Sequence, residues 1–267
     1  MLNLNFLINL NVINFLLLII VFLLIIPLYL SDANELEALF EVEIEINGKE
    51  SQKILSDNFE GEMPYKVLVN QKEIINYDYN NIIDNLTKEN NIILMKWNIS
   101  IISSSHMFEG LNNITRINFT FFDSSKINNM ENMFNGCYRL HYIEFNNFDN
   151  SSVTSMSKMF SDCSQLKILN LSNFDTSSVI EMDSMFFGCY SLSTLILDFK
   201  NTSQLTNMNS MFSGCSSLVS LDLQSFDTKL VTDMNSMFYE CSNLISLDLS
   251  NFDTLSVIEI LYFEKLF

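Results

Sequence analysis

The sequence predicts an α/β fold in which a solenoid of 26-residue repeats, with a parallel β-ladder and short helices, follows a small β-rich N-terminal cap. Each repeat combines one strand-like and one helix-like pattern. Two side-chain series recur every 26 residues: the cysteines Cys137, Cys163, Cys189, Cys215 and Cys241, and the Met-Phe pairs 107–108, 133–134, 159–160, 185–186, 211–212 and 237–238. A fixed period of this length indicates stacked copies, because each copy buries its apolar face only against its neighbours.

Within a repeat, the apolar spacing changes once. The pattern L-x-x-L-x-L at 218–223 places Leu221 and Leu223 on one face of a strand, because side chains alternate along a strand. The pattern V-x-x-M-x-x-M-F-x-x-C at 231–241 has the spacing of a short amphipathic helix. Between the two lies a phrase such as Phe-Asp-Thr-Ser at 174–177, which predicts a turn that caps the helix with Asp or Thr.

The repeats divide the chain into three parts. Residues 1–33 are predicted to be a signal peptide or signal anchor, residues 34–100 a β-rich cap region, and residues 101–267 the repeats. In the last copy Glu264 stands where Phe is expected, so we expect an open apolar end and a sequence that continues beyond residue 267. The repeats comprise a partial first coil and six full coils, 111–136, 137–162, 163–188, 189–214, 215–240 and 241–266.

The amino-terminal segment has the composition of a targeting sequence. Residues 1–30 contain no charged side chain, and a small-x-small pattern favours signal-peptide cleavage after Ala33. An uncleaved signal anchor over residues 12–30 is the first alternative, because this run approaches membrane-spanning length. A buried core helix is the second, although the run has no polar face. Either membrane interpretation places residues 34–267 outside the cytosol.

The cap region contains strand patterns. Residues 41–48 alternate acidic and aliphatic side chains and end in Asn-Gly, which predicts a half-buried strand entering a hairpin turn. Residues 65–69 and 92–97 predict further strands. Residues 85–110 already follow the repeat frame and are interpreted as a degenerate first coil. Trp97 in this coil is more typical of a buried cap residue than of a sugar-stacking platform.

Composition and motifs exclude several function classes. The net charge of −18 argues against a nucleic-acid partner, because phosphate contacts require Lys and Arg. The sequence contains no Cys-x-x-Cys pair, phosphate-binding loop, nucleophile–base pair or metal-ligand spacing. We therefore expect no catalytic residues, no cofactor and no metal. A hydrolase with its site in residues 34–110 is retained as an alternative.

The methionines and cysteines that recur with the repeat are expected in the core. Methionine beside phenylalanine favours core packing over a copper(I) site built from thioethers. Stacked strands lie about 4.8 Å apart, whereas the Cβ atoms of a disulfide lie about 3.8 Å apart. Buried free thiols are therefore predicted rather than disulfides between copies.

An acidic series recurs at the turn. Stacked carboxylates suit calcium, but a turn in which Asp accepts backbone N–H bonds requires the same residues. We favour the turn. The series is Asp123, Asp149, Asp175, Asp227 and Asp253, with Asn201 in the remaining copy.

Residues between the leucines of each strand point away from the core and form a strand face, the surface that stacked repeats offer to partners. The alternative is that these positions are only solvated. Seven glycosylation sequons also occur, and a glycan on Asn118 or Asn170 would obstruct this face. The residues of the strand face predicted to bind a partner are Tyr142, Glu144, Ile168, Asn170, Thr194, Ile196, Asp222 and Asp248.

The blocks LDLSNFDT at 247–254 and VTDMNSMFYEC at 231–241 resemble the 26-residue repeat of BspA-like leucine-rich-repeat surface proteins. The match covers residue 101 to about residue 262. The resemblance implies a leucine-rich-repeat-type solenoid in a secreted or surface-attached protein used for adhesion or binding, with no catalytic residues to carry over. The pattern departs at Asp198–Asn201, where Lys200 takes the place of Phe, and a locally different turn is expected there.

These observations predict a non-enzymatic protein, secreted or at the cell surface, that recognises protein or glycan partners on another cell or matrix through the strand face. A structural surface-coat component that self-associates is the alternative. The amino-terminal segment contacts the membrane if it is not cleaved.

Overall fold

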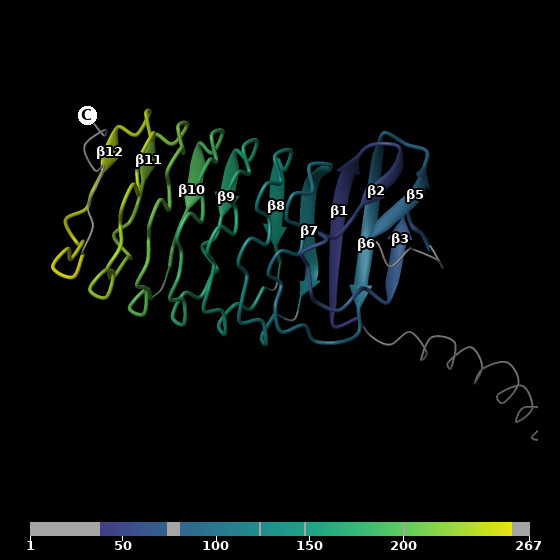
Figure 1. Cartoon of the computed structure of the whole chain (residues 1–267), viewed down its shortest axis with the longest axis horizontal. Coiled ribbons are helices and arrows are strands. Elements are labelled where there is room, and N and C mark those ends of the chain that lie inside the picture. The colour runs from purple at the N-terminus through teal and green to yellow at the C-terminus, as the bar shows by residue number, and fades with distance from the viewer. Residues whose placement is uncertain (1–37, 74–80, 123, 147, 200, 258–267) are drawn as a thin grey trace, which may run out of the picture. The chain divides into compact units, whose positions relative to one another are not determined.

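The computed structural model describes residues 38–73, 81–122, 124–146, 148–199 and 201–257. The predicted signal segment 1–33 lies outside these residues, as do Asp123 and Lys200. The described residues from Leu39 onward belong to one compact unit (Figure 1). Within the described ranges, no helix is long and apolar enough to cross a membrane.

Six strands form one mixed sheet in the order β4-β3-β6-β1-β7-β8 (Figure 1). The central strand β1 pairs antiparallel with β6 and β7, whereas β7 and β8 pair in parallel. A two-stranded sheet pairs β2 (Glu50–Lys53) with β5 (Ile82–Leu86). The strands of the six-stranded sheet are β1 (Phe40–Asn47), β3 (Lys66–Val69), β4 (Lys72–Glu73), β6 (Asn90–Trp97), β7 (Ile114–Phe122) and β8 (Tyr142–Phe145).

The strands predicted at 41–48, 65–69 and 92–97 are confirmed as β1, β3 and β6. The predicted hairpin after β1 is wrong, because β2, the next strand in the chain, pairs with β5 instead. Trp97 is fully buried, stacks on Phe40 at 4.5 Å between ring centroids, and donates from Nε1 to the Glu62 carbonyl at 2.6 Å. Trp97 is therefore a core residue of the cap, as predicted.

The later strands repeat the position of β8 at intervals of 26 residues: β9 (Ile168–Asn170), β10 (Thr194–Ile196), β11 (Ser220–Leu221) and β12 (Ser246–Leu247). They pair in parallel, β9 with β10 and β11 with β12. The predicted parallel ladder is therefore interrupted, since β8 is not paired with β9 and β10 is not paired with β11 among the described residues.

The expected α/β class, a leucine-rich-repeat-type solenoid with short helices, is wrong: the described residues contain no helix and the fold is all-β. The M-x-x-M-F-x-x-C segment forms consecutive tight turns instead. The Met133 N–H donates to the Met130 carbonyl at 3.3 Å and the Cys137 N–H to the Phe134 carbonyl at 3.1 Å. These bonds span three residues, whereas those of an α-helix span four.

Left-handed backbone at two positions of each copy explains the turns, because left-handed residues interrupt a right-handed helix. The positions lie four residues apart, as at Asn132 (φ 56°) and Gly136 (φ 72°). The first is occupied by His106, Asn132, Lys158, Ser184, Ser210 and Ser236, and the second by Gly110, Gly136, Asp162, Gly188, Gly214 and Glu240.

Backbone N–H groups that would form hydrogen bonds within a helix instead form hydrogen bonds to the neighbouring copy. The Asn132 N–H donates to the Ser157 carbonyl at 3.0 Å, and the Phe134 N–H donates to the Met159 carbonyl at 2.9 Å. Along the segment, donors to the next copy alternate with donors to the copy's own turns. Parallel bridges also link equivalent residues of successive copies: Ser103, Asn129, Ser155, Glu181, Asn207 and Asp233.

The apolar side chains of these turns form the core of the copies. Phe134 stacks on Phe108 and Phe160, with ring centroids 5.8 and 5.2 Å apart. The repeated methionines lie beside this column and are fully buried, which confirms that they pack the core. Where Lys200 interrupts the pattern, the preceding Phe199 is fully buried and lies 5.5 Å from Phe226, so the aromatic side chain comes from the neighbouring position.

The five cysteines are buried and free, as predicted. Each thiol donates to the carbonyl of a phenylalanine 29 residues earlier, for example Cys189 Sγ to Phe160 O at 3.1 Å. Burial raises the pKa of the Cys137, Cys189 and Cys241 thiols to about 12. The thiols therefore act as neutral donors between copies.

The described members of the acidic series lie in the turn. Oδ1 of Asp175 accepts the Ser177 N–H at 2.9 Å, and Oδ1 of Asn201 accepts the Ser203 N–H at 2.9 Å. The predicted acceptance of backbone N–H bonds is confirmed, including the equivalence of Asn201. The predicted role as a helix cap is wrong, because no helix follows in the described residues.

Candidate functional site

The eight predicted residues of the strand face lie on the solvent side of their strands or directly after them. Seven are exposed and Glu144 is half-buried. Tyr142, Ile168 and Ile196 are the large apolar members, with exposed fractions of 45%, 59% and 44%. The carboxylates of Asp222 and Asp248 accept backbone N–H bonds from residues two positions later, so both are engaged in their own turns.

Four of the eight residues line one hollow. Its volume is about 290 Å³, and it lies where β8 and β9 are not paired with each other. Thr194, Ile196, Asp222 and Asp248 lie on later copies and do not line it. The lining residues are Tyr142, Ile143, Glu144, Phe145, Asn146, Phe148, Ile168, Asn170, Asn173 and Phe174.

Three phenylalanines are among the lining residues of this hollow. Phe145 stands where the next copy has Leu171, and its ring packs edge-on against Phe148 and Phe174 at 4.9 and 5.0 Å between centroids. Phe145 and Phe148 are only partly buried. The exchange of Leu for Phe is the feature of the sequence that marks this copy as irregular.

A polar cluster borders the hollow. The Arg116 guanidinium carbon lies 4.8 Å from the centroid of the Tyr142 ring, and Nη2 lies 3.9 Å from Glu144 Oε2. The Tyr142 hydroxyl donates to the same Glu144 oxygen at 3.2 Å. The cation–π contact and the ion pair both favour this orientation of the guanidinium. The cluster therefore places a tyrosine, an arginine and a carboxylate side by side.

The strand face continues across the cap sheet, which the sequence did not predict. Arg116 lies opposite Tyr142 on one side and Glu45 of β1 on the other. Glu45 lies opposite Ile92 of β6. The outward residues of β8, β7, β1 and β6 thus form one surface. The sequence does not reveal the pairing of β1 with β7, and without that pairing the cap appears separate from the repeats.

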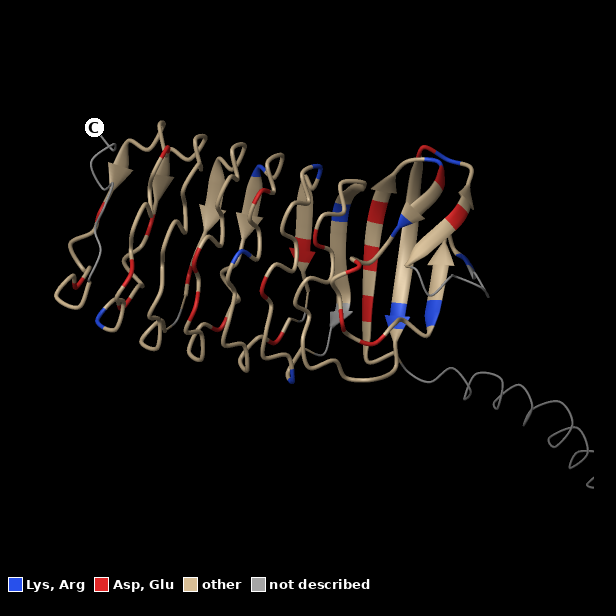
Figure 2. Ribbon diagram, viewed as in Figure 1, with Lys and Arg blue, Asp and Glu red and all other residues tan. Residues whose placement is uncertain are grey.

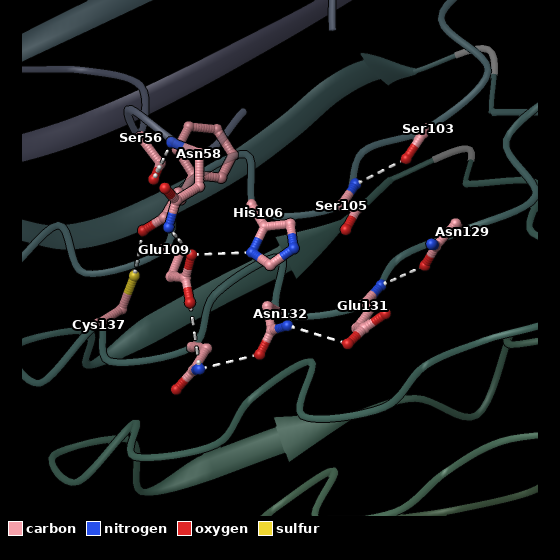
Figure 3. A network of polar contacts seen from close by, with 12 residues as sticks. Ser56, Asn58, Ser103, Ser105, His106, Glu109, Asn129, Glu131, Asn132 and Cys137 are labelled. Carbon is pink, nitrogen blue, oxygen red and sulfur yellow. Dashed lines mark hydrogen bonds and ion pairs between the residues drawn. The ribbon is translucent and has the colours of Figure 1, made fainter. Parts of the chain in front are cut away.

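A second polar site lies where the cap meets the first copies (Figure 3). His106 Nδ1 lies 2.8 Å from Glu109 Oε2, which also accepts from Asn58 Nδ2 at 2.7 Å. The adjoining hollow of about 810 Å³ has Glu60, Glu62, Glu131 and the ion-paired Asp57 in its lining. In the described ranges, no hydroxyl or thiol is hydrogen-bonded to the His106 ring, and no three His, Cys, Asp or Glu residues converge as a metal site.

The sequons differ in accessibility. Asn150 is 1% exposed and its amide bonds the Asp175 backbone, so it is closed to modification in the folded chain. Asn113 donates to the Lys53 carbonyl at 3.0 Å. Asn85, Asn170 and Asn201 are exposed.

Comparison with known proteins identifies a family without an assigned activity. No curated protein matches the chain, and no solved structure matches it. One family model, described as Mycoplasma protein of unknown function, DUF285, matches residues 77–168, 102–218 and 155–265. These overlapping matches cover the copies and part of the cap, which is more than half of the sequence, and the chain therefore belongs to the DUF285 family.

Proposed function

We propose that this protein is a non-enzymatic recognition or adhesion protein that binds a protein or glycan partner through the strand face. The observation that carries the proposal is the hollow between β8 and β9, where four of the predicted binding residues meet. Surfaces that bind partners combine apolar anchors with oriented polar groups.

The chemistry of the hollow supports this function. Tyr142 and Ile168 supply exposed apolar area, while Glu144 and Asn170 supply hydrogen-bonding groups beside them. Tyrosine and arginine are common among residues that dominate binding energy, because they combine area with directed hydrogen bonds. The contact of Arg116 with the Tyr142 ring favours the orientation in which both side chains lie at the edge of the hollow.

A location outside the cytosol belongs to the same proposal. The uncharged amino-terminal segment favours export or membrane attachment. The likeness of the repeat to BspA-like leucine-rich-repeat surface proteins favours the cell surface. A repeat family with no assigned activity is compatible with this location.

Binding of the purified full-length chain to a glycan array and to immobilised extracellular-matrix proteins tests the proposal. Ile168→Asp and Tyr142→Ala should each reduce any specific binding about tenfold or more, because they remove apolar area at the hollow. Leu230→Asp is the matched control, since Leu230 is 51% exposed and lies on a turn away from the hollow. Equal loss in all three variants, or no loss in the first two, would contradict binding at this site.

Self-association as a surface coat is the second candidate. The observation that favours it is the exposure of Ile245 (84%) and Leu255 (94%), which leaves apolar side chains free for contacts between molecules. Solution scattering at increasing concentration discriminates the two functions. A mass that grows with concentration, and that falls to a monomer in Ile245→Asp, favours the coat.

A further inference from the structure

The outward side of β6 and β1 carries another hollow, separate from the one between β8 and β9. The buried side chain of Asn91 hydrogen-bonds to segments that line this hollow. Its Nδ2 donates to the Lys88 carbonyl at 2.9 Å and to the Gly48 carbonyl at 3.1 Å, and its Oδ1 accepts from Asn70 Nδ2 at 3.0 Å. The hollow is therefore preformed by the fold, as ligand sites usually are. It measures about 410 Å³ and is lined by Glu43, Leu68, Asn70, Gln71, Lys88, Ile92 and Leu94.

Strand pairing places an apolar row beside an acidic row on this surface, which we call the cap face (Leu68, Ile92, Leu94, Glu43 and Glu45). Leu94 and Ile92 on β6 lie opposite Glu43 and Glu45 on β1. Leu68 on β3 lies opposite Leu94 on its other side. Figure 2 shows the acidic residues in a line along β1. Ile92 is 47% exposed and Leu68 and Leu94 are half-buried, so Ile92 is the most accessible member of the apolar row.

Within the described residues, Glu43 forms no ion pair with a cation, although Lys88 lines the same hollow. Of the three outward glutamates of β1, Glu41 is paired with Lys96, with Nζ and Oε1 2.6 Å apart. Glu43 lies between Leu94 and Asn118 in the sheet, and it has no ion pair within the described ranges. Its carboxylate therefore borders the apolar row without a neutralising partner.

The Glu45 carboxylate also lacks an ion pair among the described residues, but for a different reason. It lies opposite Arg116 in the sheet, but that guanidinium is directed at Tyr142 and Glu144. No ion pair joins Glu45 to another described residue. Two neighbouring carboxylates thus lie beside an apolar row on the outward side of the sheet.

We propose that the cap face binds a basic amphipathic helix of a partner protein. Carboxylates two residues apart on a strand are separated by about 6.6 Å, and helix residues four apart are separated by about 6 Å along the axis. Lysine or arginine side chains one turn apart therefore reach Glu43 and Glu45 while the apolar side of the helix covers Ile92 and Leu94. Lys88 in the same lining suits the carboxyl end of the helix, where the helix dipole is negative.

The probe is a designed Leu/Lys peptide of about five helical turns, titrated against the full-length chain by calorimetry. Two control peptides are a scrambled Leu/Lys sequence of the same composition and a Leu/Glu sequence with the same pattern. We expect saturable binding of the amphipathic Leu/Lys peptide alone. Glu43→Gln with Glu45→Gln, and separately Ile92→Ser, should each weaken it about tenfold. Glu131→Gln removes a carboxylate outside the cap face and should leave the affinity unchanged.

Two results would overturn the proposal. Equal binding of the scrambled peptide would show that attraction follows the net charge of −18 rather than the cap face. Full affinity in the double Glu variant, with unchanged amide-exchange protection of β1 and β6, would show that the carboxylates do not take part. The same protection measurement establishes that a loss of affinity in Ile92→Ser is not a loss of fold. The two proposals are tested separately, because different variants alter the cap face and the hollow between β8 and β9.

Discussion

Buried polar side chains form a second link between copies at the scale of single residues. The Thr202 hydroxyl donates to the Asp227 carbonyl at 3.2 Å and accepts the Asp227 N–H at 2.7 Å. The Thr228 hydroxyl and the Asn150 amide make the same two bonds to the next copy. One side chain thus satisfies a donor and an acceptor that would otherwise be buried without a partner.

Thr202→Val should lower the free energy of unfolding by about 2 kcal/mol, because it leaves the Asp227 N–H and carbonyl unpaired at a buried site. Thr206→Val is the matched control. The Thr206 hydroxyl only donates to the Ile180 carbonyl at a solvent-exposed position, so its loss should cost less than about 0.5 kcal/mol. Urea unfolding of the two variants measures the difference, and equal costs would refute the double-bond role of Thr202.

The raised pKa values of the buried thiols predict a loss of folding stability at alkaline pH. Burial raises the pKa of Cys189 from 9.0 to about 12, so between these values the unfolded chain has lost the proton that the folded chain keeps. The unfolded state then binds fewer protons, and stability falls as pH rises, by on the order of 1 kcal/mol per pH unit for each such thiol. Urea unfolding at pH 8 and 10.5 should show a smaller decrease for Cys189→Ala than for the natural chain. An identical decrease in both would contradict this linkage.

The element that organises the fold is the pair of turns with two left-handed residues. Glycine suits the second position because it has no Cβ to clash in this conformation. The close approach of copies adds a second constraint. A Cβ added to Gly214 would lie 3.3 Å from the Gly188 backbone, whereas one added to Gly110 would meet no atom within 4 Å.

Gly214→Ala should therefore destabilise the chain more than Gly110→Ala. Both variants force alanine into left-handed backbone, at φ 78° and 72°, which costs about 1–2 kcal/mol. Only Gly214→Ala must also push neighbouring copies apart, which we expect to add about 1 kcal/mol. Thermal unfolding of the two variants measures the difference. Equal midpoints would show that the copies separate without cost at this position.

The same element shows where sequence reasoning succeeds and fails. The strand pattern predicted the position of β11 (Ser220–Leu221) and the burial of Leu221 and Leu223, because alternation has one physical cause, burial of one strand face. The strand itself is shorter than predicted, since Leu223 lies outside it. The Met-Phe pattern predicted a helix because apolar spacings of three and four also arise from consecutive turns. Glycine occupies the second left-handed position in four copies. Because glycine is unfavourable inside a helix, its recurrence was the sequence signal against a helix.

The candidate site was predictable only in part. Tyr142 and Ile168 were placed correctly on the outward side because strand direction follows from the leucines. The hollow between them was not, because it depends on the interrupted pairing of β8 and β9. The cap face depends on the pairing of β1 with β6, residues about 50 positions apart in the chain, which local patterns do not specify.

At the scale of the whole molecule, the stacked copies are joined mainly to their immediate neighbours. Backbone bonds and parallel bridges connect each copy to the next, and the strand ladder is interrupted twice. In such an arrangement, stability is a sum of copy and interface contributions, and a local defect affects the nearest copies most. The antiparallel cap sheet is held by pairings of its own, β1 with β6 and β7.

The variant Phe160→Ala tests whether a local defect destabilises mainly the nearest copies. Phe160 is fully buried and stacks on Phe134 and Phe186 at 5.2 and 5.9 Å between centroids, so its truncation should cost about 3–5 kcal/mol. We expect hydrogen exchange to show the greatest loss of protection in the turns of residues 130–188, with β1 and β6 affected least. Phe187→Ala, at a side chain 39% exposed, is the control and should leave both regions protected. A uniform loss of protection from β1 to β12 would instead mean that cap and copies unfold as one unit, because the coupling across the interrupted ladder would then exceed the cost of the cavity.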